Sequence, residues 1–198
     1  MFPPPIKTQQ NLKERKAKQL SILQINPDPG STAYMQPFPP FPDSEASEPD
    51  EYVEFHFEDV SFDFPEPDTV GPWLLNVAEA EGKAVHEIIY IFCSDEYLRQ
   101  INIEYLDHDY YTDIITFDNS NTPDRLEGDL FISSERVADN AQTYQAPFSH
   151  ELCRVMVHGL LHLCGYGDKT EEEAQTMRAK ENFYLQQIQH VFEPLPGA

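Results

Sequence analysis

The sequence predicts an α+β fold, in which one domain is built on a mixed four-stranded sheet packed with about five helices. Four short runs are rich in β-branched and aromatic residues, which is typical of strands. Five longer stretches carry apolar residues at helical spacing. The two kinds follow one another in the order β-α-β-α-β-β-α-α-α, which indicates a single mixed sheet rather than separate layers of one type.

The composition is strongly acidic, with 13 Lys and Arg residues against 35 Asp and Glu residues and a formal net charge of −22. Such a chain repels polyanions at long range, so any role with nucleic acid must depend on local features. The three cysteines, Cys93, Cys153 and Cys164, show no paired spacing and predict reduced thiols in the cytoplasm. The sequence contains no apolar run long enough for a membrane span, and its start lacks the apolar segment of a signal peptide.

The chain divides by composition near residue 50. Residues 1–50 are predicted to be a disordered extension, because prolines are crowded there and few apolar residues are available for packing. The basic residues near its start are either solvated or an arm for nucleic acid. Residues 51–198 are predicted to be the folded domain.

The first half of the domain begins with YVEFHFE, which alternates and predicts a strand from Tyr52. GPWLLNVAEAEGKA has helical spacing, with Pro72 expected in the first turn and Gly82 as the stop. HEIIYIFC is a short apolar run that predicts a buried strand. Ser94 is then placed to cap the helix of SDEYLRQINIEYL, whose first turn is acidic.

The second half begins with two strands, TDIITF and GDLFIS. The turn-rich gap between them, DNSNTPDRLE, is too short for a crossover and favours an antiparallel pair. Three helical segments complete the chain: SERVADNAQTY, SHELCRVMVHGLLHL and TEEEAQTMRAKENFYLQQIQ.

The stretch VHGLLHLCGYGD predicts a metal-binding helix near the C-terminus. His158 and His162 are four residues apart, so their side chains share one face of the helix. Gly165 can adopt the left-handed conformation with which a helix ends, and this turn can carry Asp168 back over the pair. Three protein ligands leave a fourth position for water, as in a catalytic zinc site.

Other interpretations of these residues remain open. The histidines could instead be core residues bonded to backbone oxygens, with Asp168 exposed in a turn. Cys164 is a possible soft ligand, but it lies on a different helix face and is expected to serve in packing. A carboxylate ligand also widens the choice of metal toward manganese or iron.

Two chemistries suggested by the spacing fit poorly. A metalloprotease of the metzincin kind would have a glutamate base directly after the first histidine, where this chain has Gly159. An iron oxygenase with two histidines and one carboxylate usually takes its ligands from the strands of a β-barrel.

Four stretches, which follow one another along the chain in the family's order, resemble the YbeY family of bacterial ribosomal-RNA maturation endoribonucleases. HGLLHLCGYG is similar to the family's histidine motif at nearly every fixed position. INIEYLDHDYYTDIITF resembles the segment that precedes it in the family, and EGDLFIS resembles a family strand. WLLNVAEAEGKAVHEIIYIF is similar to the first helix and the strand after it.

The resemblance implies a zinc-dependent endoribonuclease, specific for single strands, that matures the 3′ end of 16S rRNA and acts in ribosome quality control. It implies one zinc ion on His158, His162 and Asp168, with a bound water as nucleophile. The expected partners are ribosomal RNA and small-subunit proteins in the cytoplasm, without membrane or DNA. The alternatives are a metzincin-like metallopeptidase or other metal-dependent hydrolase, and a non-catalytic ribosome-assembly factor with a structural metal.

The sequence departs from the family at two positions. The third ligand is Asp168, where the family typically has histidine. Leu106 stands where the family commonly has an arginine thought to grip phosphate, and leucine supplies no charge. His108 and Arg154 are candidates for supporting the reaction, and Gly159 is hypothesised to leave room for an RNA backbone. Further candidates for phosphate contact or cleft support are Arg99, Arg136, Arg178, Lys180, Asp113, Thr116 and Asp129.

Overall fold

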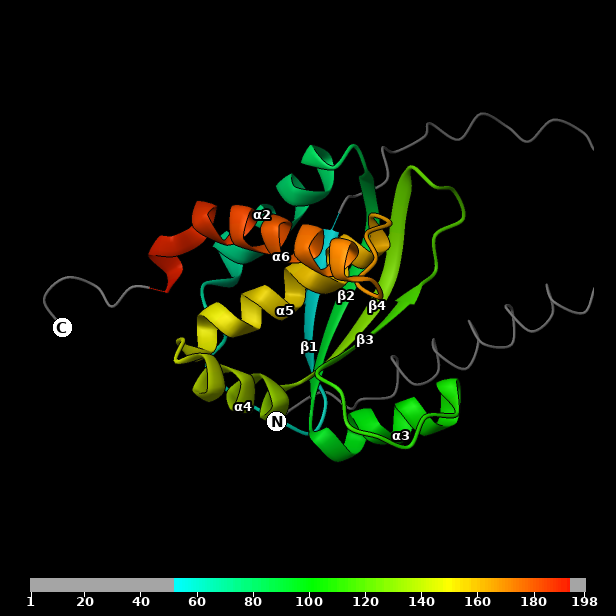
Figure 1. The fold of residues 1–198 in the computed structure, drawn as a ribbon, viewed down its shortest axis with the longest axis vertical. Helices are drawn as coiled ribbons and strands as arrows, with labels where there is room; N and C mark the ends of the chain where they lie inside the picture. The colour runs from blue at the N-terminus through cyan, green and yellow to red at the C-terminus, as the bar shows by residue number, and fades with distance from the viewer. Residues whose placement is uncertain (1–51, 193–198) are drawn as a thin grey trace, which may run out of the picture. The chain divides into compact units, whose positions relative to one another are not determined.

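The computed structural model describes residues 52–192; the extension predicted for residues 1–50 lies outside the described residues. The elements follow the predicted order, and the α+β class with a mixed four-stranded sheet and five α-helices is confirmed for this part of the chain (Figure 1). In chain order they are β1 (Tyr52–Phe57), α2 (Pro67–Ala80), β2 (Ala84–Cys93), α3 (Asp95–Leu106), β3 (Ile114–Asp118), β4 (Arg125–Ser133), α4 (Ser134–Tyr144), α5 (Phe148–Leu163), α6 (Glu171–Leu185) and the 3₁₀ helix η1 (Gln186–Val191).

The sheet has the strand order β1-β2-β4-β3. Strands β1, β2 and β4 are parallel, whereas β3 runs antiparallel to β4. The connections explain this arrangement, because α2 gives the chain enough length to return and start β2 parallel to β1. After β2 and α3 the chain runs back along β3, so β4 can start at the same end of the sheet as β2. The short connection between β3 and β4 allows only the antiparallel pair that its turn-rich sequence predicts.

Local signals place most helix ends where the sequence predicts them. Ser94 accepts a hydrogen bond from the backbone N–H of Tyr97 at 3.2 Å, which caps α3. Gly82, after the end of α2, has a φ of 74° that suits glycine. The start of α2 was predicted too late, since the helix begins at Pro67 and Pro72 lies inside it. Pro67 at the first position supplies the fixed φ that starts a helix, and this signal was overlooked.

Helix α5 lies across the sheet with almost every side buried, as its apolar sequence predicts (Figure 1). Helix α2 packs beside it against β1 and β2, and α6 packs along α5. The buried Tyr90 hydroxyl donates to the Met156 carbonyl at 3.0 Å, which fixes α5 to the central strand β2. None of the helices in the described part of the chain is long and apolar enough to cross a membrane.

Gly159 lies where α5 packs closely on β3 and β4. A Cβ atom at this position would lie 2.5 Å from Ile114 Cδ1 and 2.5 Å from Leu130 Cδ2. The hypothesis that this glycine leaves room for an RNA backbone is therefore wrong. Its small size is required by the contact between helix and sheet, and no side chain of any protease base fits there.

We predict that Gly159→Ala lowers the free energy of unfolding. Overpacking costs about 1–3 kcal/mol, which outweighs the gain of about 1 kcal/mol in helix propensity. Gly71→Ala in α2 is the matched control, because its Cβ would meet only Phe55 Cε2 at an ordinary 3.8 Å. Urea unfolding of both variants checks this prediction. An unchanged or increased stability for Gly159→Ala would contradict it.

Candidate metal centre

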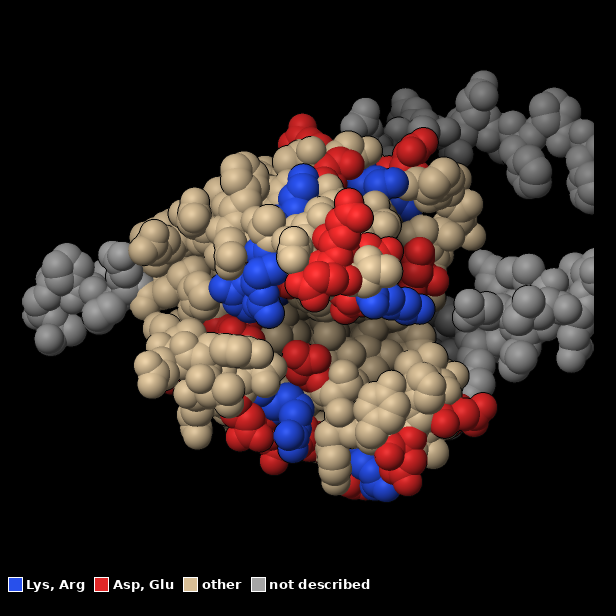
Figure 2. Space-filling model, viewed as in Figure 1, with Lys and Arg blue, Asp and Glu red and all other residues tan. Residues whose placement is uncertain are grey.

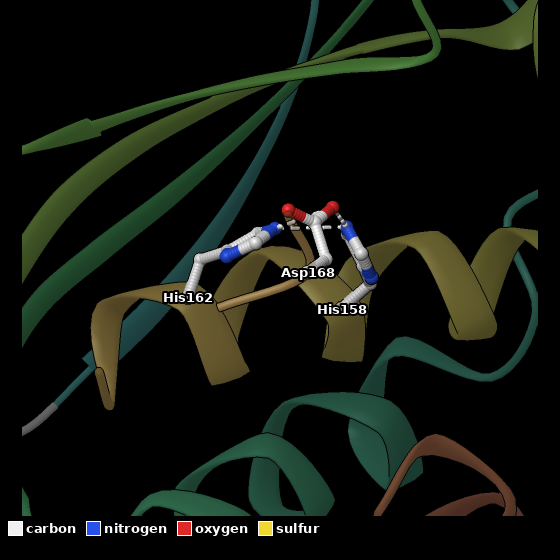
Figure 3. Close-up of side chains that lie close together, drawn as sticks. All are labelled: His158, His162 and Asp168. Carbon is white, nitrogen blue, oxygen red and sulfur yellow. Dashed lines mark hydrogen bonds and ion pairs between the residues drawn. The ribbon is translucent and has the colours of Figure 1, made fainter. Parts of the chain in front are cut away.

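Three side chains that are separate in the sequence converge at the C-terminal end of α5. His158 and His162 lie one turn apart on α5, and Asp168 reaches them from the turn that leads into α6 (Figure 3). The two histidine Nε2 atoms are 3.0 Å apart, and Asp168 Oδ2 lies 3.9 Å from His158 Nε2 and 3.6 Å from His162 Nε2. The three ligand residues predicted from the sequence are thus brought to one point.

The hydrogen bonds behind the two rings decide which nitrogens carry protons. His162 Nδ1 lies 2.9 Å from the carbonyl oxygen of Tyr166, which can only accept, so Nδ1 is the donor. His158 Nδ1 lies 2.9 Å from Glu181 Oε1 and donates to this carboxylate in the same way. In the neutral rings both Nε2 atoms therefore hold lone pairs. Two lone pairs facing one another at 3.0 Å are stabilised by a cation between them.

The spacing of the three ligand atoms fits a transition-metal ion. Zinc binds oxygen and nitrogen at about 2.0–2.2 Å, so neighbouring tetrahedral ligands lie roughly 3.3 Å apart. The observed separations of 3.0, 3.6 and 3.9 Å bracket this value. The side chains of His158, His162 and Asp168 are 23%, 29% and 44% exposed. This partial exposure leaves one side of the site open, as a catalytic centre requires and a closed structural site does not.

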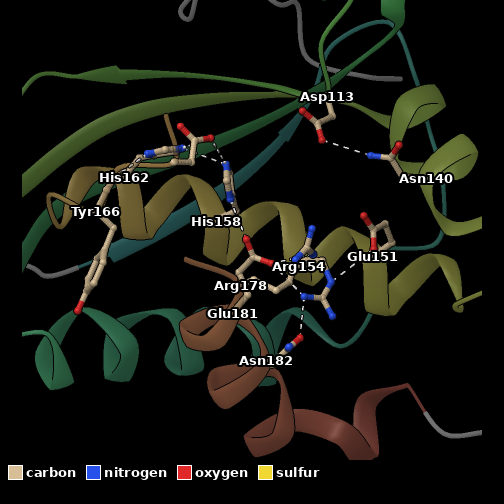
Figure 4. A network of polar contacts seen from close by, with 11 residues as sticks. Asp113, Asn140, Glu151, Arg154, His158, His162, Tyr166, Arg178, Glu181 and Asn182 are labelled. Atoms are coloured by element: carbon tan, nitrogen blue, oxygen red, sulfur yellow. Dashed lines mark hydrogen bonds and ion pairs between the residues drawn. The ribbon is translucent and has the colours of Figure 1, made fainter. Parts of the chain in front are cut away.

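Glu181 on α6 is the residue that holds His158 in place. Its side chain is only 4% exposed and accepts from His158, from Arg154 at 2.9 Å and from Arg178 at 3.0 Å (Figure 4). Burial alone would raise the pKa of Glu181, but the hydrogen bonds from His158 and Arg154 outweigh it, and the pKa lies below its usual value. The ionised carboxylate fixes the tautomer and the orientation of the ring.

The turn that carries Asp168 is fixed at its start, where it leaves α5. Gly165 has a φ of 103°, and the N–H of Tyr166 donates to the Leu161 carbonyl at 3.0 Å, which closes α5 as predicted. The Tyr166 hydroxyl donates to Glu81 at the end of α2 at 2.7 Å. These contacts place the Tyr166 carbonyl behind His162 and Asp168 in front of it.

The site opens into a cleft of about 610 Å³ between α3, β3 and the α5–α6 turn. Figure 2 shows the hollowed face, with charged side chains gathered along the edge of the hollow and mostly uncharged atoms in its floor. Leu106 and His108 line this cleft, as do Asp113 and Thr116. Asp129 does not; it is buried and accepts from Asn119 at 2.9 Å, which agrees with a structural role.

The basic residues expected to contact phosphate are all paired with carboxylates. Arg154 does not line this cleft; it is bonded to Glu181 and to Asn182 (Figure 4). It lines a smaller pocket of about 120 Å³ that shares His158 and Asp113 with the cleft. The other pairs are Arg99–Asp109, Arg136–Asp95, Arg178–Glu181 and Lys180–Glu81. Among the described residues that line the cleft, Lys169 is the only lysine or arginine.

Cys164 is not part of the group. Its side chain packs against the hydrophobic core, and burial raises the pKa of its thiol to about 12. A thiol in this state is a poor metal ligand. The expectation that Cys164 serves in packing is confirmed.

The fold and the site define a class of protein: an α+β domain in which a buried helix presents a His/His/Asp group to an open cleft. The family model described as Endoribonuclease YbeY matches residues 61–189, and the chain belongs to this family, as its motifs predicted. It is 51% identical over 136 residues to "Endoribonuclease YbeY" of Cytophaga hutchinsonii, which covers 69% of this chain and 95% of that protein.

Two further comparisons agree. The chain is 51% identical over 120 residues to "Endoribonuclease YbeY" of Phocaeicola vulgatus, over 61% of this chain and 86% of that protein. The solution structure of TM1509 from Thermotoga maritima aligns with a TM-score of 0.52 at 21% identity, over 74% of this chain and 99% of that one. This last likeness supports the fold.

Glu181 is a functional residue that the sequence alone could have indicated. Met177, Glu181, Tyr184 and Leu185 follow the i, i+4, i+7, i+8 spacing of a buried stripe, and all four are buried. A carboxylate in such a stripe needs a partner inside the fold, and the histidine pair on the preceding helix supplies one. Lys169 was missed because nothing in the sequence shows which turn residues face the cleft.

We predict that Glu181→Gln weakens zinc binding by about 10- to 100-fold, because the amide no longer holds the His158 ring with a full charge. The measurement is the zinc Kd by chelator competition on the full chain. Glu172→Gln, an exposed change on the same helix, is the control and should leave the Kd unchanged. Equal zinc affinity for Glu181→Gln and the unaltered chain would show that Glu181 does not position the ligand.

Proposed function

We propose that this chain is an endoribonuclease, specific for single strands, that uses one zinc ion held by His158, His162 and Asp168. The proposal rests above all on the convergence of two imidazole lone pairs and a carboxylate at the wall of an open cleft. The family supports RNA as the substrate, since the relatives reported above carry the name endoribonuclease.

Each residue of the site has a distinct part in this proposal. A bound zinc ion would supply Lewis acidity toward a phosphate oxygen and would lower the pKa of a water molecule. Glu181 and the Tyr166 carbonyl hold the two rings in the tautomer whose Nε2 atoms can bind a cation. Asp168 would neutralise one positive charge of the ion, so a water bound there would be less acidic than beside three histidines.

The proposed substrate is the 3′ end of 16S rRNA, with a further role in ribosome quality control. The proposed partners are ribosomal RNA and small-subunit proteins, and the proposed location is the cytoplasm. A protein partner would explain how so acidic a chain, with a formal net charge of −22, reaches a polyanion. Docking energy from a ribosomal protein would offset the unfavourable long-range field.

The peptidase alternative requires a glutamate base directly after His158, and this fold leaves no room for one. The position after His158 faces β3 and β4, where a Cβ would lie 2.5 Å from two side chains. A glutamate there could not reach the metal side of the helix. An assembly factor with a structural metal would have a closed site, whereas these three ligand side chains are partly exposed.

The test is cleavage by the zinc-loaded full chain of single-stranded RNA, duplex RNA and casein. The expected result is cleavage of the single-stranded RNA alone. His162→Ala should lower the rate on the order of 100-fold or more, since it removes a metal ligand. His190→Ala, an exposed histidine on η1, is the matched control and should retain full activity.

Three outcomes would contradict the proposal. Cleavage of casein but not RNA would favour a peptidase. If neither is cut, and chelation of the metal lowers the unfolding temperature, the metal has a structural role. Full RNA cleavage by a folded His162→Ala variant would separate the activity from this site.

A further inference from the structure

The wall of the cleft opposite the metal ligands is aromatic and apolar where a nuclease would be expected to carry cations. Leu106, His108 and Tyr110 line the same cleft as His158 and His162. The Tyr110 side chain is 55% exposed and that of Leu106 is 43% exposed. Large apolar surfaces that remain open in a cleft are typical of binding sites.

The rings of His108 and Tyr110 are already arranged as a stack. Their centroids are 5.2 Å apart with an angle of 27° between the ring planes. The Tyr110 hydroxyl also lies 3.2 Å from His108 Nδ1, which holds the two side chains together. A near-parallel pair of rings offers an outer face to a third flat group.

The loop that carries this pair is fixed by Asn102, a buried residue of α3. The Asn102 side chain donates to the Tyr110 carbonyl at 2.9 Å, and the Asn102 backbone carbonyl accepts from the His108 backbone N–H at 3.2 Å. Asp107 takes the left-handed conformation, with a φ of 57°, that turns the chain at this point. The aromatic pair is therefore held in place before a ligand arrives, which lowers the entropic cost of binding.

The charges of the cleft argue against a grip based on phosphate. Asp113, Asp118 and Asp168 line it, while Lys169 is its only lysine or arginine within the described part of the chain. The nearby Arg99 is paired with Asp109 at 2.6 Å. One lysine among three aspartates adds little attraction for a polyanion beyond what a bound metal ion would supply, so contacts that do not depend on charge would contribute to binding here.

We propose that the His108–Tyr110 pair stacks on a nucleobase of the single-stranded RNA substrate. This inference rests on the proposed endoribonuclease function and names how that site holds its substrate. Base stacking on aromatic side chains is available to every base and needs the base unpaired, so it selects single strands without reading sequence. Leu106 adds an apolar edge beside the stacked base.

The experiment measures KM and kcat of the zinc-loaded full chain on a short single-stranded RNA. Tyr110→Ala should raise KM by roughly 5- to 150-fold while kcat changes little, because the ring contacts a base and not the reacting phosphate. Tyr110→Phe keeps the ring face but loses the hydroxyl contact with His108, so its KM should rise less than that of Tyr110→Ala. Phe183→Ala is the matched control, since Phe183 is a 57% exposed aromatic residue of α6 that does not line the cleft.

A second arm uses a series of RNAs with the same sequence, each with one abasic nucleotide at a different position. At the stacked position the abasic RNA should raise KM for the unaltered chain and add nothing to the effect of Tyr110→Ala. An unchanged KM for Tyr110→Ala, in a chain that cleaves RNA, would overturn the stacking inference alone. The inference would also be overturned if the effects of the abasic nucleotide and of Tyr110→Ala on KM multiplied at every position. In that case the ring and the base would act independently. If the unaltered chain does not cleave RNA, the proposed function fails and the inference fails with it.

Discussion

The site depends on one constraint, which is that two imidazole rings on a buried helix must present their Nε2 lone pairs to the same point. The rings meet this constraint because each has a fixed acceptor behind it, the Glu181 carboxylate for His158 and the Tyr166 carbonyl for His162. If either acceptor were removed, the ring that it holds could turn or change tautomer. The fold around α5 can be understood as the set of contacts that keeps these acceptors in place.

Those contacts reach across the domain. Glu181 belongs to α6, whose buried stripe packs on α5, and Arg154 and Arg178 keep its charge compensated. Tyr166 is tied to Glu81 at the end of α2, which also accepts from Lys180 at 2.8 Å and from Tyr184. Burial raises the pKa of Glu81, but its hydrogen bonds from Lys180, Tyr184 and Tyr166 bring it below its usual value. The metal-facing geometry is thus supported by carboxylates that stay ionised inside the protein.

Much of this architecture could be predicted from the residues alone. Periodicity and caps gave the element order, since Ser94, Gly82 and Gly165 act through local backbone chemistry. The i, i+4 spacing gave the histidine pair for the same reason. Glu181, Lys169 and the His108–Tyr110 pair could not be placed in this way, because their contacts depend on how α6, the α5–α6 turn and the loop after α3 pack in space. Gly159 was misread because the sequence does not show which face of α5 meets the sheet.

The acidic chain has few basic side chains available to bind RNA in the described cleft. The basic side chains predicted to contact phosphate form ion pairs within the protein. The described lining of the cleft has one lysine and three aspartates. A site of this kind would hold RNA through its metal and through flat apolar surfaces. Leu106, which stands where an arginine was expected, then belongs to the same apolar surface of the cleft.

The central claim is that His158, His162 and Asp168 bind one cation together. Its most direct test is metal analysis of the purified full chain beside Asp168→Ala, after dialysis against the same low concentration of zinc. The account predicts one zinc per unaltered chain, clear loss of zinc from Asp168→Ala, and full occupancy in Asp118→Ala, which changes a cleft aspartate outside the group. An unaltered chain without zinc, or an Asp168→Ala variant that keeps a full ion, would contradict it.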